Sequence, residues 1–178
     1  MLLDGLITSK TRIKLLLKFF INPENMSYLR QLSGEFNEST NSVRIELNSL
    51  TKAKILQREK DKNTVAYRAN KSHPLFDEIR SIILKSVGID RIISSIIENL
   101  GKPDLIILTG DYAKGNDSGI IDIIIVGKVD KANLDNYILI AEKKIDRKVR
   151  YLVLSKDEFE KLEKTLQKDK LLILWKNC

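Results

Sequence analysis

The feature that most constrains the fold is the order of the apolar patterns in residues 9–69. Three segments there repeat apolar residues every three or four positions, which is the period of an amphipathic helix. The sequence therefore predicts helices over residues 9–20, 28–36 and 40–52, with a serine at or just before the start of each that is suited to cap it (Ser9, Ser27 and Ser39). In the third helix the inward residues are Val43, Leu47 and Leu50, at spacings of four and three.

Two short β-prone runs follow the third helix. They cover residues 55–60 and 64–69 and are joined by Asp61, Lys62 and Asn63, a polar connection typical of a hairpin. Two helices, a tight turn, a third helix and a basic hairpin follow one another in the order of a winged helix-turn-helix. We therefore predict this fold for residues 1–72.

The positive charge of the chain is concentrated in the same region. Lys and Arg total 31 against 24 Asp and Glu, a net charge of +7, and residues 1–72 hold 13 basic and 7 acidic side chains. The segments 73–100 and 101–178 contribute only −1 and +2. This distribution favours a polyanionic partner for the first segment, although charge alone is equally compatible with a solvated basic surface.

Outward-facing polar residues supply candidate contacts to double-stranded DNA. An α-helix fits the major groove, and the preceding short helix braces it across the backbone. Arg44 could read guanine or hold a phosphate, and Asn41 and Asn48 could read adenine edges or bind phosphates. The candidates are Thr40, Asn41, Arg44 and Asn48 on the third helix, Tyr28 and Arg30 on the second, and Arg58, Lys60, Lys62 and Arg68 on the hairpin.

Two alternatives stay open for this segment. Ile45, which also faces outward, would either touch a thymine methyl group or pack against protein. The whole winged helix could also serve only to contact another protein, without binding DNA.

The single histidine and single cysteine exclude several kinds of site. Cys178 is the last residue, so the chain has no internal disulfide and no thiolate zinc cluster. A single histidine cannot build a two-histidine metal site within one chain, and His73, which precedes Pro74, is interpreted as an ordinary residue before a helix rather than a catalytic one. We therefore predict no metal site and no cofactor.

The apolar runs are short, and the first residues lack a secretory pattern. No run approaches the roughly 18 residues of a membrane span. Residues 1–5 do not place a charged segment before an apolar one. We expect a cytoplasmic protein without membrane contact.

The pattern changes after Pro74. Apolar residues follow a helical period over residues 75–87, Gly88 ends that helix, and residues 89–100 form a second helix that is apolar on several sides. Such surface must be buried against the next domain or against a second chain. Gly101, Lys102 and Pro103 indicate a boundary. The predicted division is a winged-helix domain at 1–72, a helical linker at 73–101 and a further domain at 102–178.

The last segment alternates strands and helices. Strands are predicted over residues 104–109, 120–126, 149–154 and 171–175, with a loop at 110–119 and helices at 133–146 and 156–167. A small mixed sheet with helices is expected, so the chain as a whole is predicted to be α+β. Asp122 is the single charge inside its strand and requires a hydrogen bond or ion pair, for which Arg147, Lys148 and Arg150 are candidates, or else lines a ligand cleft.

Four stretches together resemble one family. They are residues 9–12 with the helix that follows, residues 42–47, residues 67–71 leading to 73–76, and the loop and strand at 110–127. In order and spacing they resemble prokaryotic transcriptional regulators that join an N-terminal winged-helix domain to a C-terminal nucleotidyltransferase-like (polymerase-β-like) domain. The resemblance implies a dimeric DNA-binding repressor or activator with an appended nucleotidyltransferase fold.

The catalytic motif that the resemblance implies is degenerate in this chain. In that fold a Gly-Ser pair holds the triphosphate, and paired acids on a strand, with a third acid nearby, bind two magnesium ions. Here Gly110 is followed by Asp111 in place of serine, and isoleucine replaces one member of the acidic pair, whether Asp122 is taken as the first or the second. The third acidic position falls near Arg150.

The resulting hypothesis is a DNA-binding transcriptional regulator whose C-terminal domain is catalytically inactive. That domain would serve dimerisation, sensing of a small molecule, or contact with a protein effector. The alternative is an active metal-dependent nucleotidyltransferase that modifies a protein or small molecule, in which the loop residue Asp117 would replace the missing acid.

Overall fold

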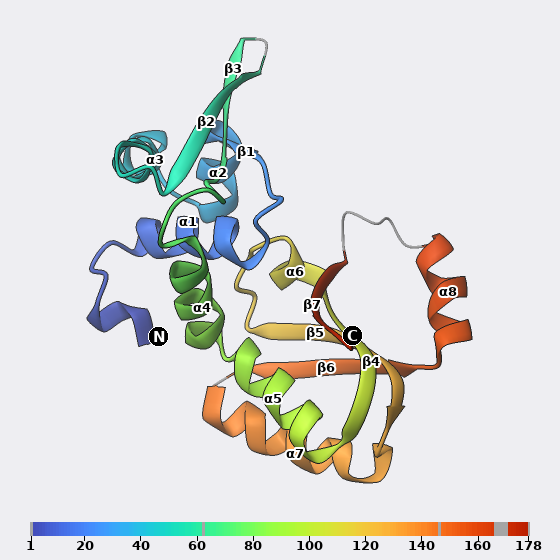
Figure 1. The fold of residues 1–178 in the computed structure, drawn as a ribbon. Coiled ribbons are helices and arrows are strands. Elements are labelled where there is room, and N and C mark those ends of the chain that lie inside the picture. Colours follow the sequence, from blue (N-terminus) through green and yellow to red (C-terminus); the bar gives the residue numbers. More distant parts are fainter. Residues whose placement is uncertain (1, 62, 146, 166–170, 178) are drawn as a thin grey trace. The chain divides into compact units, whose positions relative to one another are not determined.

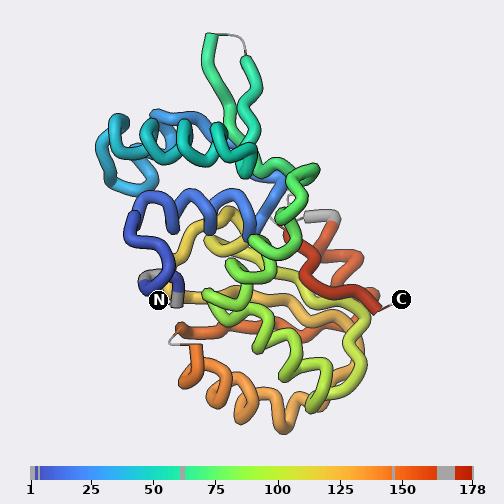
Figure 2. Tube along the Cα trace, turned by 60° about the vertical axis from the view of Figure 1, so that its left-hand side comes forward, coloured from blue at the N-terminus to red at the C-terminus, as the bar shows by residue number. Residues whose placement is uncertain are grey.

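The computed structural model describes residues 2–61, 63–145, 147–165 and 171–177. The chain forms two compact units, residues 1–86 and 87–178, shown in Figures 1 and 2 with colours that follow the sequence. The predicted helical segment 73–101 is divided between them, since α4 (Phe76–Val87) closes the first unit and α5 (Ile89–Asn99) opens the second.

The first unit is a winged helix-turn-helix, as predicted. Its elements in chain order are the 3-10 turn η1 (Leu2–Gly5), α1 (Lys10–Ile21), β1 (Ser27–Tyr28), α2 (Leu29–Phe36), α3 (Thr40–Lys52), β2 (Leu56–Asp61), β3 (Thr64–Ala69) and α4. The three strands form an antiparallel sheet in the order β1-β3-β2. The β2–β3 hairpin projects beyond the helices of this unit (Figure 1).

Two of the three predicted serine caps are confirmed. Ser9 Oγ accepts a hydrogen bond from the Arg12 amide at 3.2 Å and begins α1. Ser39 Oγ accepts one from the Ser42 amide at 3.1 Å and begins α3. Asn37 adopts the left-handed conformation with φ 52° and ends α2, because an asparagine tolerates this conformation better than most residues.

The prediction that Ser27 caps the second helix is wrong. Ser27 and Tyr28 form β1, where Ser27 lies opposite Tyr67 and Tyr28 opposite Ala66. The helix therefore begins at Leu29 rather than Tyr28, and Tyr28 precedes it without a side-chain cap. Pairing with β3 uses the backbone of these residues in a ladder, and local spacing alone does not indicate that long-range contact.

The core of the first unit is apolar and drawn from its three main helices. Phe19 and Phe20 of α1, Leu32 of α2, and Val43 and Leu47 of α3 are all fully buried. The predicted inward face of α3 is thereby confirmed. Its burial fixes which side of α3 faces solvent.

The second unit is a four-stranded mixed sheet with helices on both faces. It contains α5, β4 (Gly101–Thr109), α6 (Gly110–Ala113), β5 (Ile120–Val129), α7 (Lys131–Ile145), β6 (Lys148–Leu154), α8 (Lys156–Thr165) and β7 (Leu172–Lys176). The strand order is β6-β5-β4-β7, with β5 and β6 parallel and the other pairs antiparallel. Together the two units confirm the predicted α+β class.

The alternation of side chains along β5 sorts the two faces of this sheet. Phe159 of α8 packs with Ile107, Ile124 and Val126, so these residues face α8. Because side chains two residues apart share a face, Asp122 lies on the α8 face as well. The opposite face is covered by α5 and α7 (Figure 1).

The main corrections in this unit concern β4, β5 and the loop between them. β4 begins at Gly101, so residues 101–103 belong to a strand, and the pairing with β5 shifts between Pro103 and Leu105. β5 extends to Val129. The expected loop at 110–119 contains the short helix α6 at its start. The predicted end of the last helix, Gln167, lies outside the described residues.

Gly88, the predicted helix stop, takes a backbone conformation that disfavours side chains. Its φ is +83°, and a Cβ there would lie 2.2 Å from Ile145 Cγ2. We expect Gly88→Ala to lower the free energy of unfolding by about 3 kcal/mol through combined backbone strain and overpacking. Gly119→Ala is the matched control, because its φ is +78° but nothing lies within 4 Å of the added carbon. Urea unfolding would measure both, and equal losses would contradict the proposed clash.

Candidate nucleic-acid interface

The predicted contact residues of α3 share one exposed face. Thr40, Asn41, Arg44 and Asn48 are all exposed, while Val43, Leu47 and Leu50 on the other side are buried. Ile45, on the same side as the polar residues, is 58% exposed. Ile45 therefore does not pack in the apolar core of the first unit. The face combines hydrogen-bonding groups with one cation and one apolar side chain.

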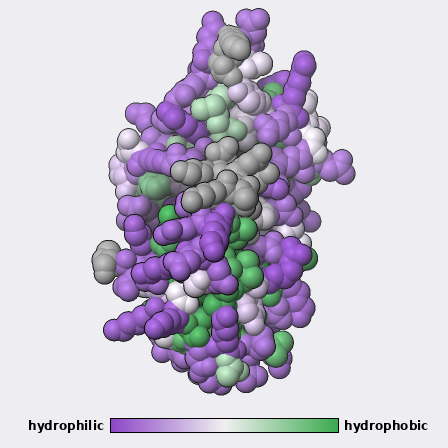
Figure 3. All heavy atoms as spheres, turned by 90° about the vertical axis from the view of Figure 1, so that its right-hand side faces the viewer, coloured by the Kyte–Doolittle hydropathy of each residue, from purple (hydrophilic) through white to green (hydrophobic). Residues whose placement is uncertain are grey.

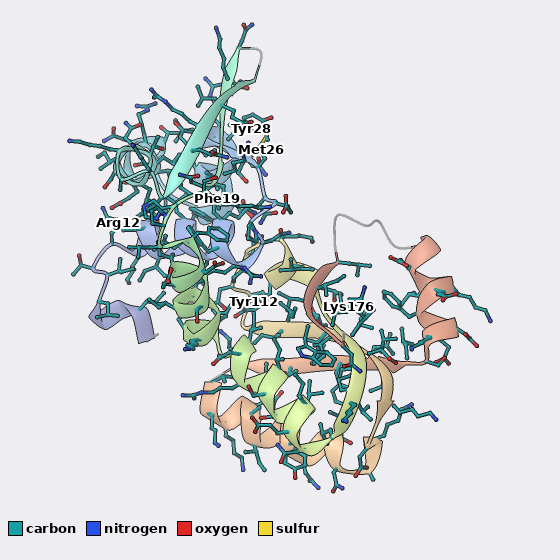
Figure 4. The ribbon with its side chains drawn as sticks, in the orientation of Figure 1. Arg12, Phe19, Met26, Tyr28, Tyr112 and Lys176 are labelled. Atoms are coloured by element: carbon teal, nitrogen blue, oxygen red, sulfur yellow. The ribbon has the colours of Figure 1, made fainter. Side chains whose placement is uncertain are left out.

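Arg12 of α1 forms hydrogen bonds with two side chains of α3, and these two contacts are named the Arg12 clamp. Arg12 Nε donates to Glu46 Oε2 at 2.7 Å, and Arg12 Nη2 donates to Ser49 Oγ at 3.2 Å. The Glu46 side chain is only 13% exposed, whereas that of Arg12 is 39% exposed. Local sequence patterns do not indicate this contact, because Arg12 and Glu46 are 34 positions apart. Arg12 is labelled in Figure 4.

Two lysines of α1 bind the segment before α3. Lys14 Nζ donates to Glu38 Oε1 at 2.8 Å and to the Phe36 carbonyl at 3.0 Å. Lys18 Nζ, nearly buried, donates to Glu35 Oε1 at 2.6 Å. Hydrogen bonds from Lys14 and Thr11 hold the pKa of Glu38 below its ordinary value. Together with Arg12, these contacts attach α2, the turn and α3 to one helix.

The acidic residues of the first 72 positions are largely used in such pairs. The pairs between described side chains are Arg12–Glu46, Lys14–Glu38, Lys18–Glu35, Arg68–Glu59 and Lys71–Glu24. The cations of this stretch that have no acidic partner among the described residues are Lys10, Arg30, Arg44, Lys52, Lys54, Arg58 and Lys60, and all are exposed. The net positive charge of the segment therefore lies on its surface, including α2, α3 and β2.

The predicted DNA-contacting cations of the hairpin differ in whether they already have an acidic partner. Arg58 and Lys60 lie exposed on β2. Arg68 of β3 instead forms an ion pair with Glu59 of β2, so its charge is already compensated. Lys62 lies outside the described residues. Arg30 is exposed in the first turn of α2, and Tyr28, labelled in Figure 4, is half-buried in β1.

In the second unit, Asp122 is held by an arginine on the neighbouring strand. Asp122 and Arg150 are direct neighbours in the parallel pairing of β5 and β6. Arg150 Nε donates to Asp122 Oδ1 at 2.6 Å, and Arg150 Nη2 donates to Asp122 Oδ2 at 2.9 Å. The expected ion pair is thus confirmed, with Arg150 as the partner, and both carboxylate oxygens bind the guanidinium fork.

Gly110 closes tightly against the same carboxylate. Its φ is +66°, and a Cβ there would lie 2.4 Å from Asp122 Oδ2. Asp111, the next residue, is exposed and lies 3.7 Å from Lys114 Nζ. A cleft of about 420 Å³ opens beside these groups, lined by Thr109, Gly110, Asp122, Ile123, Ile124, Arg150, Tyr151, Leu152, Leu162 and Leu171. Its walls are mostly apolar, and its charged groups are paired with each other.

The loop residue Asp117 also binds neighbouring side chains, Arg147 and Tyr112. Arg147 Nη2 donates to Asp117 Oδ2 at 2.6 Å, and Arg147 Nε donates to the Tyr112 hydroxyl at 2.6 Å. The Tyr112 hydroxyl in turn donates to Asp117. Burial raises the pKa of Asp117, but the hydrogen bonds from Arg147 and Tyr112 outweigh it and leave the pKa below its ordinary value. Burial together with Asp117 raises the pKa of Tyr112. Arg147 therefore binds Asp117 and not Asp122.

The α8 face of the sheet is incompletely covered. A groove of about 550 Å³ runs beside α8, with an apolar floor that includes Leu105, Val126 and Ile173 and a charged rim that includes Lys156 and Glu160. Figure 3 shows apolar side chains gathered among polar ones on this side of the molecule. Among the described side chains, no group of three or more His, Cys, Asp or Glu is placed to hold a metal ion.

No helix in the described part of the chain combines the length and hydropathy that a bilayer span requires.

No protein-family model and no curated protein matches the chain.

Two solved structures are similar to parts of the chain. Reduced HlyU from Vibrio cholerae matches at 18% sequence identity and a TM-score of 0.35, covering 46% of this chain and 77% of that one. A candidate nucleotidyltransferase from Sulfolobus solfataricus matches at 26% identity and a TM-score of 0.30, covering 56% of this chain and 84% of that one. Because both TM-scores lie below 0.5, these likenesses carry no functional conclusion for this chain.

The Arg12 clamp has a measurable contribution to stability. We expect Arg12→Ala to lower the free energy of unfolding of the first unit by about 1 kcal/mol, a value reduced by solvent screening at a partly exposed pair. Arg30→Ala is the control, because Arg30 is exposed and has no acidic partner within the described chain. Its effect should stay within about 0.5 kcal/mol. Equal effects in chemical unfolding would mean that the clamp adds nothing.

Proposed function

We propose that this protein is a sequence-specific transcriptional regulator that binds double-stranded DNA through residues 1–72. The observation that carries the proposal is the distribution of charge on the winged helix. Cations of α1 form ion pairs with Glu35, Glu38 and Glu46. Cations without an acidic partner among the described residues are exposed on α2, α3 and β2. A surface of this kind attracts phosphates by releasing their counterions.

The proposed geometry follows from the exposed faces. α3 enters the major groove and presents Thr40, Asn41, Arg44 and Asn48 to base edges. Arg58 and Lys60 of the hairpin, together with Lys62, contact the flanking backbone. Arg30, in the first turn of α2, reaches a phosphate next to the helix N-terminus. Arg68 contributes through its pair with Glu59 to the shape of the hairpin rather than to phosphate binding.

We further propose that the regulator is a cytoplasmic homodimer. A two-fold dimer places two α3 helices about 34 Å apart and requires a pseudo-palindromic site. This arrangement doubles the number of phosphate contacts and steepens the dependence of affinity on salt.

We also propose that the second unit, residues 87–178, which contains the domain predicted at 102–178, is a degenerate nucleotidyltransferase-like domain without catalytic activity. Hard divalent cations require several free oxygen ligands. Asp122 instead binds Arg150 through both oxygens, Asp117 binds Arg147, and Asp111 stands where the resemblance implies a serine. Such a domain can still serve dimerisation or the sensing of a small-molecule or protein effector.

Variants on the two parts of the interface should behave differently. Arg44→Ala should weaken binding to a selected operator about 5- to 150-fold and relax its sequence preference, since a bidentate base contact is lost. Lys60→Ala should weaken all sequences equally and reduce the salt slope by about 0.9, the contribution of one phosphate. Lys143→Ala, exposed on α7, is the control. Electrophoretic shifts with operators selected from random DNA measure all three, and unchanged affinity in both test variants would refute the interface.

The catalytic alternative has a direct test. Full-length protein incubated with labelled ATP and magnesium should transfer no label to itself, to other proteins or to small molecules, because the acids of the site are paired with arginines. Label transfer that disappears in Asp122→Asn would overturn the proposal and favour an active nucleotidyltransferase. Absence of any DNA shift at moderate salt would instead favour a winged helix that contacts only protein.

A further inference from the structure

Helix α4 carries an apolar stripe that the chain leaves exposed. Leu75, which directly precedes the helix, is 55% exposed, and Ile82 is 47% exposed. The two residues are seven positions apart, close to two full turns, so they lie on one face. Isolated apolar side chains are common on protein surfaces. The charges beside this pair make the face distinctive.

Glu78 and Lys85 flank the stripe on one side. Viewed along the helix axis, they lie about 40° and 60° from Ile82 in the same direction. Both are exposed, and neither has an ion-pair partner among the described residues. They are separated by about 10 Å along the axis, which is too far for a pair within one helix. An acid beside the start of the stripe and a base beside its end are thus both available to another molecule.

We propose that this face of α4 binds α4 of a second copy of the chain in an antiparallel arrangement around a two-fold axis. The axis passes near Ile82, so the two Ile82 side chains meet at the centre. Glu78 of each copy then lies opposite Lys85 of the other, which forms two equivalent ion pairs. A parallel two-fold arrangement would instead set Glu78 level with Glu78 and Lys85 level with Lys85, so that no opposite charges meet. The charge pattern is therefore self-complementary only for the isologous, antiparallel pair.

This inference deepens the proposed function and rests on its dimer. It assigns the interface to the end of the first unit, so that the groove and the paired acids of the second unit are left for sensing. Acids in the first turn of α4 and a base in its last turn also stabilise the helix alone through its dipole. The two roles differ in what charge reversal does, and this difference defines the experiment.

The apolar centre is tested by sedimentation of the full chain over a range of concentrations. The wild-type protein should be a dimer at micromolar concentration, and Ile82→Asp should weaken the dimer about 100-fold or more, because a charge replaces the central contact. Ile140→Asp is the matched control, since Ile140 is 51% exposed on α7. Circular dichroism would verify that both variants are folded. A dimer that survives Ile82→Asp overturns the assignment.

The charge pairs are tested by exchange. Glu78→Lys alone and Lys85→Glu alone should each weaken the dimer about tenfold, because two attractive pairs become repulsive. An equimolar mixture of the two variants should restore a heterodimer, and the double variant should restore a homodimer. Glu98→Lys, exposed on α5, should have no effect. A helix-dipole role alone gives no recovery in the mixture, and that result would overturn the proposal.

The outcomes also separate this inference from the proposed function. A dimer that is unaffected by the α4 variants places the interface elsewhere and leaves the regulator standing. A wild-type chain that is monomeric at all concentrations removes the dimer itself. In either case the Arg44 and Lys60 measurements on a single half-site still decide whether the first unit binds DNA.

Discussion

The first unit depends on the ionic contacts between α1 and the segments that precede and form α3. Arg12, Lys14 and Lys18 lie on one helix and bind Glu46, Glu38 and Glu35. These contacts do two things at once. They fix α3 against an apolar core that includes Val43 and Leu47, and they remove negative charge from the surface. The electrostatic character of the exposed face is thus a consequence of how the interior is held together.

In the second unit, by contrast, the charged side chains near the sheet neutralise one another. Asp117, in the loop before β5, and Asp122, near the start of β5, are each neutralised by an arginine at or next to β6. The cost of placing a carboxylate beside an apolar strand is met by a bidentate partner, and little net charge is left over. One unit therefore presents uncompensated cations, whereas the other presents an apolar face with paired charges. This contrast underlies the proposed division between DNA binding and sensing.

Most of the fold could be predicted because its elements have strong local patterns. The periods of α1 and α3, the serine caps Ser9 and Ser39, and the hairpin connection are all properties of short sequence windows. What could not be predicted depends on partners far along the chain. Ser27 is a strand residue because β3 pairs with it, and Pro103 lies within β4 next to an irregularity in the pairing with β5.

The same distinction between local patterns and distant contacts applies to the candidate sites. The exposed face of α3 followed from its buried face, whereas the Arg12 clamp and the contact between Tyr112 and Arg147 join residues about 35 positions apart. The pairing of Asp122 was foreseen only as one of three cationic neighbours. Sequence spacing could not choose among them, because the choice depends on the alignment of β6 with β5.

The Asp122–Arg150 pair also bears on which alignment the two strands adopt. Most residues that β5 and β6 place opposite each other are apolar, so apolar contacts alone distinguish poorly between registers shifted by two residues. A slip of one residue would turn Arg150 to the opposite face of the sheet, and a slip of two in one direction would place Leu152 against the carboxylate. The pair penalises both errors. A partly exposed ion pair that adds little to stability can thus still favour one alignment of the strands over its neighbours.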